Sequence, residues 1–464
     1  FGVESIVNRF GQLKPSLLLA HQKYSYNGKK FDQEDKINQL QRFLPSLKKT
    51  ILFDSSFDNW NLNSNYWIDY ELESVNFDHP LWVLFSSGTT GKPKAITHST
   101  GGILLEQYKS LSLHQNIVSG DRFFWNTTTG WMMWNYAIGS FLCGAVLCLY
   151  DGSANFPDIG VQWRFAKEAK INHFGNGSPL FIASMKQDID DVNDKDLKFI
   201  KTIGATGSPL SVEAFKWLQK KLPKAQIISL SGGTDVCSAF IGGCSKLPVY
   251  AGFLQCNMLG ASIQAWDENG KNIKGETGEL VITEPMPSMP IYFWGDHDFK
   301  KYHNSYFVKN PGVWTHGDWI YIDDLKGVLM QGRSDATLNR NGIRIGTSEI
   351  YSALDSVSEI KDSLIIDLNT DTSSKLILFV ESENKLNQNL KNKINEVIKN
   401  KCSPRHTPNL IFSISQVPYT ISGKKMEIPI KKILLGQNID DVVSKGAMRN
   451  PECIDDFLKL KVNI

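Results

Sequence analysis

The sequence lacks clustered cysteines. Its seven cysteines are scattered along 464 residues, none belongs to a C-x-x-C pair, and they have no histidine cluster at the spacing of zinc ligands. Disulfide-stabilised domains and zinc-binding domains both need such clusters. We therefore expect neither a disulfide framework nor a structural metal site, and the thiols are predicted to be reduced.

An excess of charge of one sign is also missing. The chain carries 50 Lys and Arg residues against 48 Asp and Glu residues, a formal net charge of +2. Proteins that bind nucleic acid depend on concentrated positive charge, so no nucleic-acid partner is expected. The hydrophobic content of 41% is that of ordinary globular proteins, and the length predicts two or more cores.

The stretch at positions 131–150 (WMMWNYAIGSFLCGAVLCLY) contains twenty residues without a charge. That length could span a bilayer. However, Gly144 divides the run into a helix pattern and a strand pattern, and no basic flank orients it. The run predicts buried core and no membrane span.

The chain does not begin with methionine. It starts at Phe1, and the first ten residues, FGVESIVNRF, have the pattern of an amphipathic helix and not that of a cleavable signal. We expect the sequence to start inside a longer protein, with part of its first domain missing.

The texture of the sequence changes twice. Up to about residue 242, apolar strand patterns alternate with helix patterns, which predicts an α/β fold with a largely parallel sheet covered on both faces. Short strands and Gly-rich turns follow and predict a β subdomain. A small α+β unit begins at about residue 332. The predicted domains are residues 1–334 and residues 335–464.

The stretch LWVLFSSGTTGKPK, at 81–94, joins an apolar run to a polar loop. LWVLF predicts a buried strand, and the loop offers backbone N–H groups, hydroxyls and lysines, which suit phosphate oxygens. It is not a Walker A loop, because Pro93 follows Lys92 and the next residues, AITHS, predict a strand. A flexible surface hairpin is the alternative. The proposed phosphate contacts are Ser86, Ser87, Gly88, Thr89, Thr90, Gly91, Lys92 and Lys94.

Further segments follow in a recognisable order: GATGSPLS at 204–211, LSGGTD at 230–235, WTHGD at 314–318, GRSDATLNRNGIRIG at 332–346 and YTISGKK at 419–425. With the phosphate loop, they resemble the motifs of the acyl-adenylate-forming superfamily, which includes acyl-CoA synthetases, luciferases and nonribosomal adenylation domains. The resemblance implies small-molecule substrates, with ATP, CoA and Mg²⁺ as cofactors.

The resemblance also implies roles for single residues. Lys424 would neutralise charge that develops between a substrate carboxylate and the α-phosphate. Asp235 would bind Mg²⁺, although the superfamily has Glu at this position. Asp318 would hold the ribose, unless it only stabilises a turn. The other implied ATP contacts are Thr234, Arg344, Arg333, Gly207, Ser208 and Pro209, and Lys425, Lys431 and Lys432 are expected to form a solvated basic face.

A two-step reaction is implied as well. The carboxylate attacks ATP to form an acyl-adenylate, and the thiol of CoA then displaces AMP. In the superfamily the small domain turns between the steps about a hinge, here at Asp335. Asn341 and Gly342 match the face that admits CoA, and Lys29 is a further candidate for its phosphates.

The acid is expected to be short. Gly232 stands where acetyl-CoA synthetases have an indole, which suggests a roomier pocket, and Trp131, Met133 and Thr206 match other pocket positions, with the Thr206 hydroxyl as an added donor. FGVESIVNRFGQLKPSLLLA, YSYNGKKFD, MPSMPIYFWGD and VPYTISGKKMEIPIKKILLG resemble the acetoacetate-activating members of the superfamily. We expect a cytosolic acetoacetate:CoA ligase that releases AMP. The alternatives are a ligase for acetate or butyrate and a truncated, non-catalytic nucleotide-binding protein.

Overall fold

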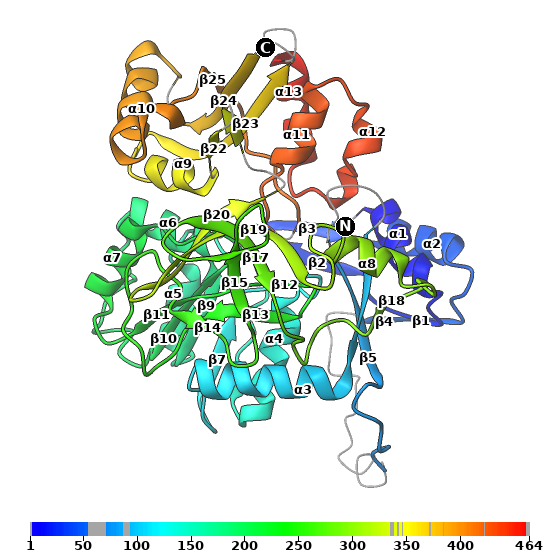
Figure 1. The fold of residues 1–464 in the computed structure, drawn as a ribbon. Helices are drawn as coiled ribbons and strands as arrows, with labels where there is room; N and C mark the ends of the chain where they lie inside the picture. Colours follow the sequence, from blue (N-terminus) through cyan, green and yellow to red (C-terminus); the bar gives the residue numbers. More distant parts are fainter. Residues whose placement is uncertain are drawn as a thin grey trace.

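The computed structural model describes residues 2–53, 71–86, 93–334, 338–340, 343–345, 347–370, 373–383, 385–421 and 423–460. The described elements up to β20 form one large unit, and those from β21 to the last helix form a smaller unit that lies against it (Figure 1). All seven cysteines are free thiols, as predicted.

A five-stranded parallel sheet is the centre of the large unit. Its order is β11-β10-β9-β7-β8, and every neighbouring pair is parallel, which confirms the prediction. Trp163, Phe174 and Phe181 are fully buried between the sheet and its helices. The elements are β7 (Arg122–Trp125), β8 (Val146–Leu147), β9 (His173–Gly177), β10 (Thr202–Thr206), β11 (Gln226–Ser229), α5 (Val161–Glu168), α6 (Ser178–Lys186) and α7 (Val212–Lys221).

The predicted β subdomain is an antiparallel sheet of order β16-β15-β17-β19-β20. Leu280, Trp314 and Ile320 form part of its buried core. The elements are β15 (Ile263–Trp266), β16 (Asn272–Ile273), β17 (Thr277–Ile282), β19 (Trp314–Asp323) and β20 (Gly327–Arg333). A short sheet beside it contains β12 (Ser231–Gly233), β13 (Ser238–Gly242) and β14 (Cys256–Asn257).

The apolar run before the phosphate loop is a strand, but it is not buried. Strand β5 (Pro80–Phe85) lies at the edge of a sheet of order β18-β6-β5, and Leu81 is 40% exposed. An edge strand has a neighbour on one side only, so part of its surface stays open. The fully buried strand is its partner β6 (Ala95–Ser99), which lies between β5 and β18 (Tyr292–Phe293).

The N-terminal region packs α1 (Val3–Leu13) and α2 (Glu34–Phe43) beside the parallel pair β1 (Leu17–His21) and β4 (Lys49–Phe53). A hairpin of β2 (Lys23–Tyr26) and β3 (Lys29–Asp32) projects from it. At its turn Asn27 and Gly28 have φ of 51° and 73°. Positive φ at both positions is the geometry that Asn-Gly favours in two-residue hairpins.

The uncharged run at 131–150 is divided as predicted. It forms α4 (Met133–Gly139), a 3₁₀ helix (Ser140–Cys143) and β8, with Gly144 in the left-handed region at φ 70°. No helix in the described ranges has the length and apolarity to cross a membrane. Helix α3 (Thr100–Tyr108) follows β6 and continues as a π-helix (Lys109–His114). Helix α8 (Lys300–Tyr306) follows β18.

The smaller unit is α+β. Its sheet has the order β23-β24-β25, and alternate side chains of β24 face two separate cores: Ile377 and Phe379 face one, Leu376 and Leu378 the other. The boundary predicted between residues 334 and 335 adjoins residues outside the described part. The elements are β21 (Leu338–Arg340), β22 (Ile343–Ile345), α9 (Thr347–Leu354), β23 (Ile360–Thr370), β24 (Ser373–Ser382), α10 (Gln388–Lys401), β25 (Leu410–Ser413), α11 (Glu427–Leu434), α12 (Ile439–Val442), α13 (Ile454–Leu460) and 3₁₀ turns at Pro404–His406, Lys445–Ala447 and Pro451–Cys453.

Candidate active site

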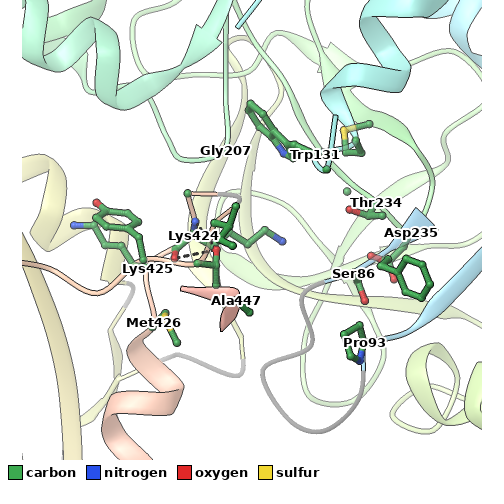
Figure 2. Close-up of a pocket in the computed structure, with 18 of the residues that line it drawn as sticks. Ser86, Pro93, Trp131, Gly207, Thr234, Asp235, Lys424, Lys425, Met426 and Ala447 are labelled. Atoms are coloured by element: carbon green, nitrogen blue, oxygen red, sulfur yellow. Dashed lines mark hydrogen bonds between the residues drawn. The ribbon is translucent and has the colours of Figure 1, made fainter. Parts of the chain in front are cut away.

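A large cavity lies between the two units. Its volume is about 1720 Å³, and it is lined by the ends of β5, β10 and β11, by β12, α4, β19 and β20, and by the segments 419–429 and 440–448 of the smaller unit. Figure 2 shows Lys424 on one side of this cavity and Thr234 and Asp235 on the other, with Trp131 and Gly207 at one end. The motifs that the sequence places far apart therefore meet in one space.

Both ends of the phosphate loop lie at the cavity. Ser86 donates its backbone N–H to the carbonyl of Lys94 at 3.3 Å, which closes the base of the loop. The Lys94 ammonium lies 3.0 Å from the Asp235 carboxylate and 4.8 Å from the centre of the Tyr306 ring. The intervening loop residues, 87–92, lie outside the described residues.

Asp235 is the most strongly held carboxylate of the site. Its Oδ1 accepts hydrogen bonds from Lys94 and from the Tyr306 hydroxyl. Burial raises the pKa of this carboxyl, but the neighbouring Lys94 and His316 and the Tyr306 bond outweigh burial and hold the pKa well below its usual range. Asp235 is therefore ionised at any physiological pH.

A buried histidine supports Asp235 from behind. His98, on β6, lies with Nε2 2.9 Å from the backbone carbonyl of Asp235. Burial lowers the pKa of His98 to about 4, so its ring is neutral and Nε2–H donates to that carbonyl. The sequence indicated a strand at AITHS, but no motif pointed to His98 or Tyr306, and His316 stood within WTHGD without an assigned role, since these roles depend on contacts between distant elements.

Two side chains of the site could bind Mg²⁺. Thr234 and Asp235 supply one hydroxyl and one carboxylate, and no group of three or more metal-ligating His, Cys, Asp or Glu side chains occurs in the described ranges. Mg²⁺ is commonly held by one or two carboxylates together with substrate phosphates and water. The residues fit a Mg²⁺ that arrives with phosphates and do not form a closed metal cage.

Asp318 and Arg333 face each other across β19 and β20, where they are paired in register. Their side chains are 3.3 Å apart, and Arg333 also donates to the carbonyl of His316 at 3.2 Å. The alternative of a turn-stabilising Asp318 is wrong, because Asp318 lies within β19. Both side chains line the cavity, with a carboxylate that can accept hydrogen bonds beside a cation that attracts phosphate.

Lys424 is presented by a tight turn. Thr420 donates its N–H to the Lys424 carbonyl at 2.9 Å and receives the Lys424 N–H on its hydroxyl at 3.0 Å. The Lys424 side chain is open to the solvent of the cavity, yet cavity walls surround it. The resulting desolvation and the charges of Arg333 and Lys94 lower its pKa, while Asp235 and Asp318 oppose this.

The next lysine has a different environment. Lys425 lies 2.7 Å from Asp362 and 3.8 Å from the centre of the Tyr351 ring, within its own unit. Lys431 lies 2.6 Å from Asp367. The prediction of a solvated basic face is therefore wrong for Lys425 and Lys431, whose carboxylate partners could be identified only from the fold.

Two interpretations of the acyl pocket need correction. The Thr206 hydroxyl donates to the Leu230 carbonyl at 2.8 Å, so its single proton is not offered to a ligand. A Cβ on Gly232 would lie 1.9 Å from the Ser238 carbonyl oxygen. The missing side chain therefore permits the close approach of β12 to β13, and it does not open the room that the comparison with an indole suggested.

The remaining predicted residues fall into two groups. Trp131, Met133, Gly207, Ser208 and Pro209 all line the cavity, and Gly207 has a φ of 87° that suits glycine. Lys29 is exposed on the β2–β3 hairpin and does not line the described cavity, so its role stays a prediction. Outside the described residues or side chains lie Ser87, Gly88, Thr89, Thr90, Gly91, Lys92, Asp335, Asn341, Gly342 and Arg344.

Comparison with known proteins gives consistent matches. The model of the family described as AMP-binding enzyme matches residues 1–293. The acetoacetyl-CoA synthetase of Mus musculus is 37% identical over 478 residues, which cover 98% of this chain and 71% of the relative. The acetoacetyl-coenzyme A synthetase of Rhizobium meliloti (strain 1021) is 36% identical over 478 residues, 99% of this chain and 73% of the relative.

Solved structures are similar as well. Acetoacetyl-CoA synthetase from Streptomyces lividans superposes with a TM-score of 0.90 at 40% identity, covering 100% of this chain and 73% of that chain. An anthranilate CoA ligase, AuaEII, in complex with anthranoyl-AMP has a TM-score of 0.78 at 19% identity, over 93% and 81% of the two chains. The second match concerns the fold alone.

Proposed function

The chain belongs to the AMP-binding enzyme family, among its acetoacetyl-CoA synthetases, and from this premise we propose that it joins acetoacetate to CoA in an ATP-dependent reaction. The products are acetoacetyl-CoA, AMP and pyrophosphate, and the intermediate is an acyl-adenylate. The observation that carries the proposal is the single cavity in which Lys424 faces Lys94, Asp235, Asp318 and Arg333.

In the first step a carboxylate oxygen of acetoacetate forms a bond to the α-phosphorus of ATP, and the bond to the pyrophosphate oxygen breaks. Negative charge increases on the oxygens of the α-phosphate. The Lys424 ammonium, held on its turn at the cavity wall, neutralises this charge in the transition state. Arg333 binds phosphate oxygens, and Asp318 accepts hydrogen bonds from the ribose hydroxyls.

Leaving pyrophosphate is held at the phosphate loop. Lys94 is the described cation of this loop, and Thr234 offers a hydroxyl. Asp235 and Thr234 would hold Mg²⁺ together with the phosphates, and the ion supplies positive charge that stabilises the leaving group. Because the pKa of Asp235 is held low, its carboxylate is ready as a ligand without losing a proton first.

In the second step the sulfur of CoA attacks the acyl carbon, the thiol proton is lost, and AMP leaves. We assign the conformational change between the two steps to a rotation of residues 335–464 relative to residues 1–334, with Asp335 as the hinge. Asn341 and Gly342 would form the CoA entrance, Arg344 would contact phosphate, and Lys29 would contact the CoA nucleotide. The seven free thiols support a reducing compartment, for which we propose the cytosol.

A thioester assay with a panel of acids tests the function. The protein is incubated with ATP, Mg²⁺, CoA and either acetoacetate, butyrate or acetate, and thioester and AMP are measured. We expect the highest kcat/KM with acetoacetate. A higher value with butyrate or acetate would favour the alternative short-acid ligase, and nucleotide binding without any thioester would favour the non-catalytic alternative.

The role of Lys424 is tested separately for each step. Lys424→Ala should abolish acid-dependent exchange of pyrophosphate with ATP and should spare thioester formation from preformed acetoacetyl-adenylate and CoA. Lys432→Ala, on α11 and outside the described cavity lining, is the matched control and should keep both steps. Normal pyrophosphate exchange in Lys424→Ala would overturn the assignment.

A further inference from the structure

We propose that the side-chain amide of Asn135 recognises the ketone of acetoacetate, which deepens the proposed function by assigning the group that separates this acid from butyrate. The two acids have chains of the same length, and they differ at the third carbon, where acetoacetate has a carbonyl. A pocket that prefers the ketone must offer its oxygen a hydrogen-bond donor.

The obvious donors of the pocket are already committed. Thr206 donates its proton to the Leu230 carbonyl at 2.8 Å. The Ser238 hydroxyl bonds to the Glu106 carboxylate at 2.8 Å and lies 3.2 Å from the Ser110 hydroxyl. Since each hydroxyl has one proton, neither can serve the ketone without losing a buried bond.

Tyr136 has a free hydroxyl that faces the wrong way. The residue lines the cavity with its ring and is 1% exposed, and its hydroxyl oxygen is buried with no bonded partner in the described structure. The ionisable groups that act on that hydroxyl are Glu106 and Cys143, and neither lines the cavity. A ligand in the cavity cannot reach this hydroxyl while the wall is intact.

Asn135 has a side-chain donor that is not already bonded, and it lies at the cavity. It lies on α4, lines the cavity, and is 8% exposed. Trp131, which also lines the cavity, lies just before this helix. No hydrogen bond of its side-chain amide is found in the described part of the chain, so the amide is open to a ligand in the cavity. A ligand carbonyl can accept from its Nδ2–H.

The surroundings of Asn135 also fit the distal part of a short acyl chain. Met133 and Tyr136, on the same helix, pack in one apolar cluster with Leu230 and Ala239, and all four line the cavity. The ionic groups described above lie outside this helix: Lys94 precedes β6, Asp235 follows β12, Asp318 and Arg333 lie on β19 and β20, and Lys424 lies on its turn. The Asn135 amide therefore offers a hydrogen-bond donor among the apolar side chains at this end of the cavity.

Two substitutions remove the donor in different ways. Asn135→Leu replaces the amide with an apolar side chain of similar size, and Asn135→Asp keeps the shape but leaves only acceptors at neutral pH. We expect kcat/KM for acetoacetate to fall by at least about tenfold in both variants. With butyrate, Asn135→Leu should keep or exceed the wild-type value, because butyrate has no ketone.

Ser231→Ala is the control, since Ser231 also lines the cavity with a hydroxyl but is more exposed to solvent. Its ratio of acetoacetate to butyrate activity should stay at the wild-type value. Butyrate-dependent pyrophosphate exchange verifies that each variant is folded, and Asn135→Ala, which also lacks a donor, replaces Asn135→Leu if the latter does not fold. Wild-type ratios in the folded Asn135 variants, or a changed ratio in Ser231→Ala alone, would overturn the inference. Failure of the proposed function differs, because the wild-type protein would then show no preference for acetoacetate.

Discussion

Lys94 and Asp235 form an ion pair of 3.0 Å, although 141 positions separate them in the sequence. The pair joins the end of the phosphate loop to the turn that follows β12. Its side chains are 33% and 16% exposed, so solvent screens it only in part. The contact explains how two motifs that act on the same phosphates are kept in register before any ligand binds.

Asp235→Asn should weaken both the fold and the first step. The substitution leaves Lys94 half-buried without its counter-charge, and we expect the free energy of unfolding to fall by about 1–3 kcal/mol. Urea unfolding and pyrophosphate exchange measure the two effects. In the control Asp324→Asn, which removes the exposed partner of Lys274, the loss should stay under about 1 kcal/mol. Equal losses in the two variants would contradict the structural role of the inner pair.

Lys425 is predicted to position Lys424. Its ammonium binds Asp362 at 2.7 Å and also donates to the Ser363 carbonyl, so it attaches the turn to β23. Lys425→Met should lower kcat of adenylate formation by roughly 10- to 100-fold, because a small displacement of the neighbouring ammonium is enough. The KM for ATP should change little, and Lys425→Arg should restore part of kcat.

The control for this experiment is Lys431→Met. Lys431 pairs with Asp367 at 2.6 Å in the same unit, but it lies on α11 and not on the turn. It should affect stability more than kcat. If Lys425→Met and Lys431→Met lowered kcat equally, a general loosening of the unit would explain the result, and the positioning role would be rejected.

Titration of the Asp355 carboxyl should make the stability of the protein depend on pH. Asp355 directly follows α9, and burial raises its pKa from an ordinary value of 3.8 to about 6. Repulsion by Asp362 adds to this rise. The positive charges of Lys186 and Lys425 and a hydrogen bond from Ser211 act in the opposite direction. The folded state therefore holds this proton to higher pH than the unfolded state does. The contribution of this group to the free energy of unfolding is fully present below about pH 4 and is lost as the pH rises through about 6. The loss is at most about 3 kcal/mol.

Comparison with Asp355→Asn isolates this contribution from other titrating groups. The variant and the wild-type protein should have similar urea midpoints near pH 4.5, and the variant should be the more stable of the two at pH 7. A constant difference across this range would show that Asp355 does not titrate there. Asp324→Asn, at an exposed site, should follow the wild-type curve throughout.

Gly232→Ala should destabilise the β12–β13 pair. The added Cβ would meet the Ser238 carbonyl oxygen at 1.9 Å, and this atom belongs to the backbone and cannot rotate away. We expect a loss of about 1–3 kcal/mol and reduced activity with every acid. Gly177→Ala is the control, since its Cβ would find its nearest neighbour at an ordinary 3.5 Å. Improved activity with acetate in Gly232→Ala would instead support the earlier view that position 232 sets pocket size.

Much of the fold could be predicted because it depends on local patterns. The Asn27-Gly28 turn requires positive φ at both positions, and Gly144 ends a helix in the left-handed region, which glycine adopts without a Cβ penalty. The alternation of apolar strands and helices up to residue 242 predicted the parallel sheet. Strand β5 was misjudged, because an apolar run does not reveal whether the strand will have one neighbour or two.

The sequence could predict which residues form the site, but it could not predict which partners their side chains contact. The order of the motifs by itself determined the reaction class and identified Lys424, Asp318 and Asp235, since phosphate chemistry restricts which residue types can serve. Only the tertiary structure decided which polar groups remain available. Thr206 is committed to Leu230 and Lys425 to Asp362, while Asn135 is left without a partner in the described residues. Hydrogen bonds and ion pairs form between whichever side chains the packing brings within about 3 Å, and that distance is set by elements far apart in the sequence.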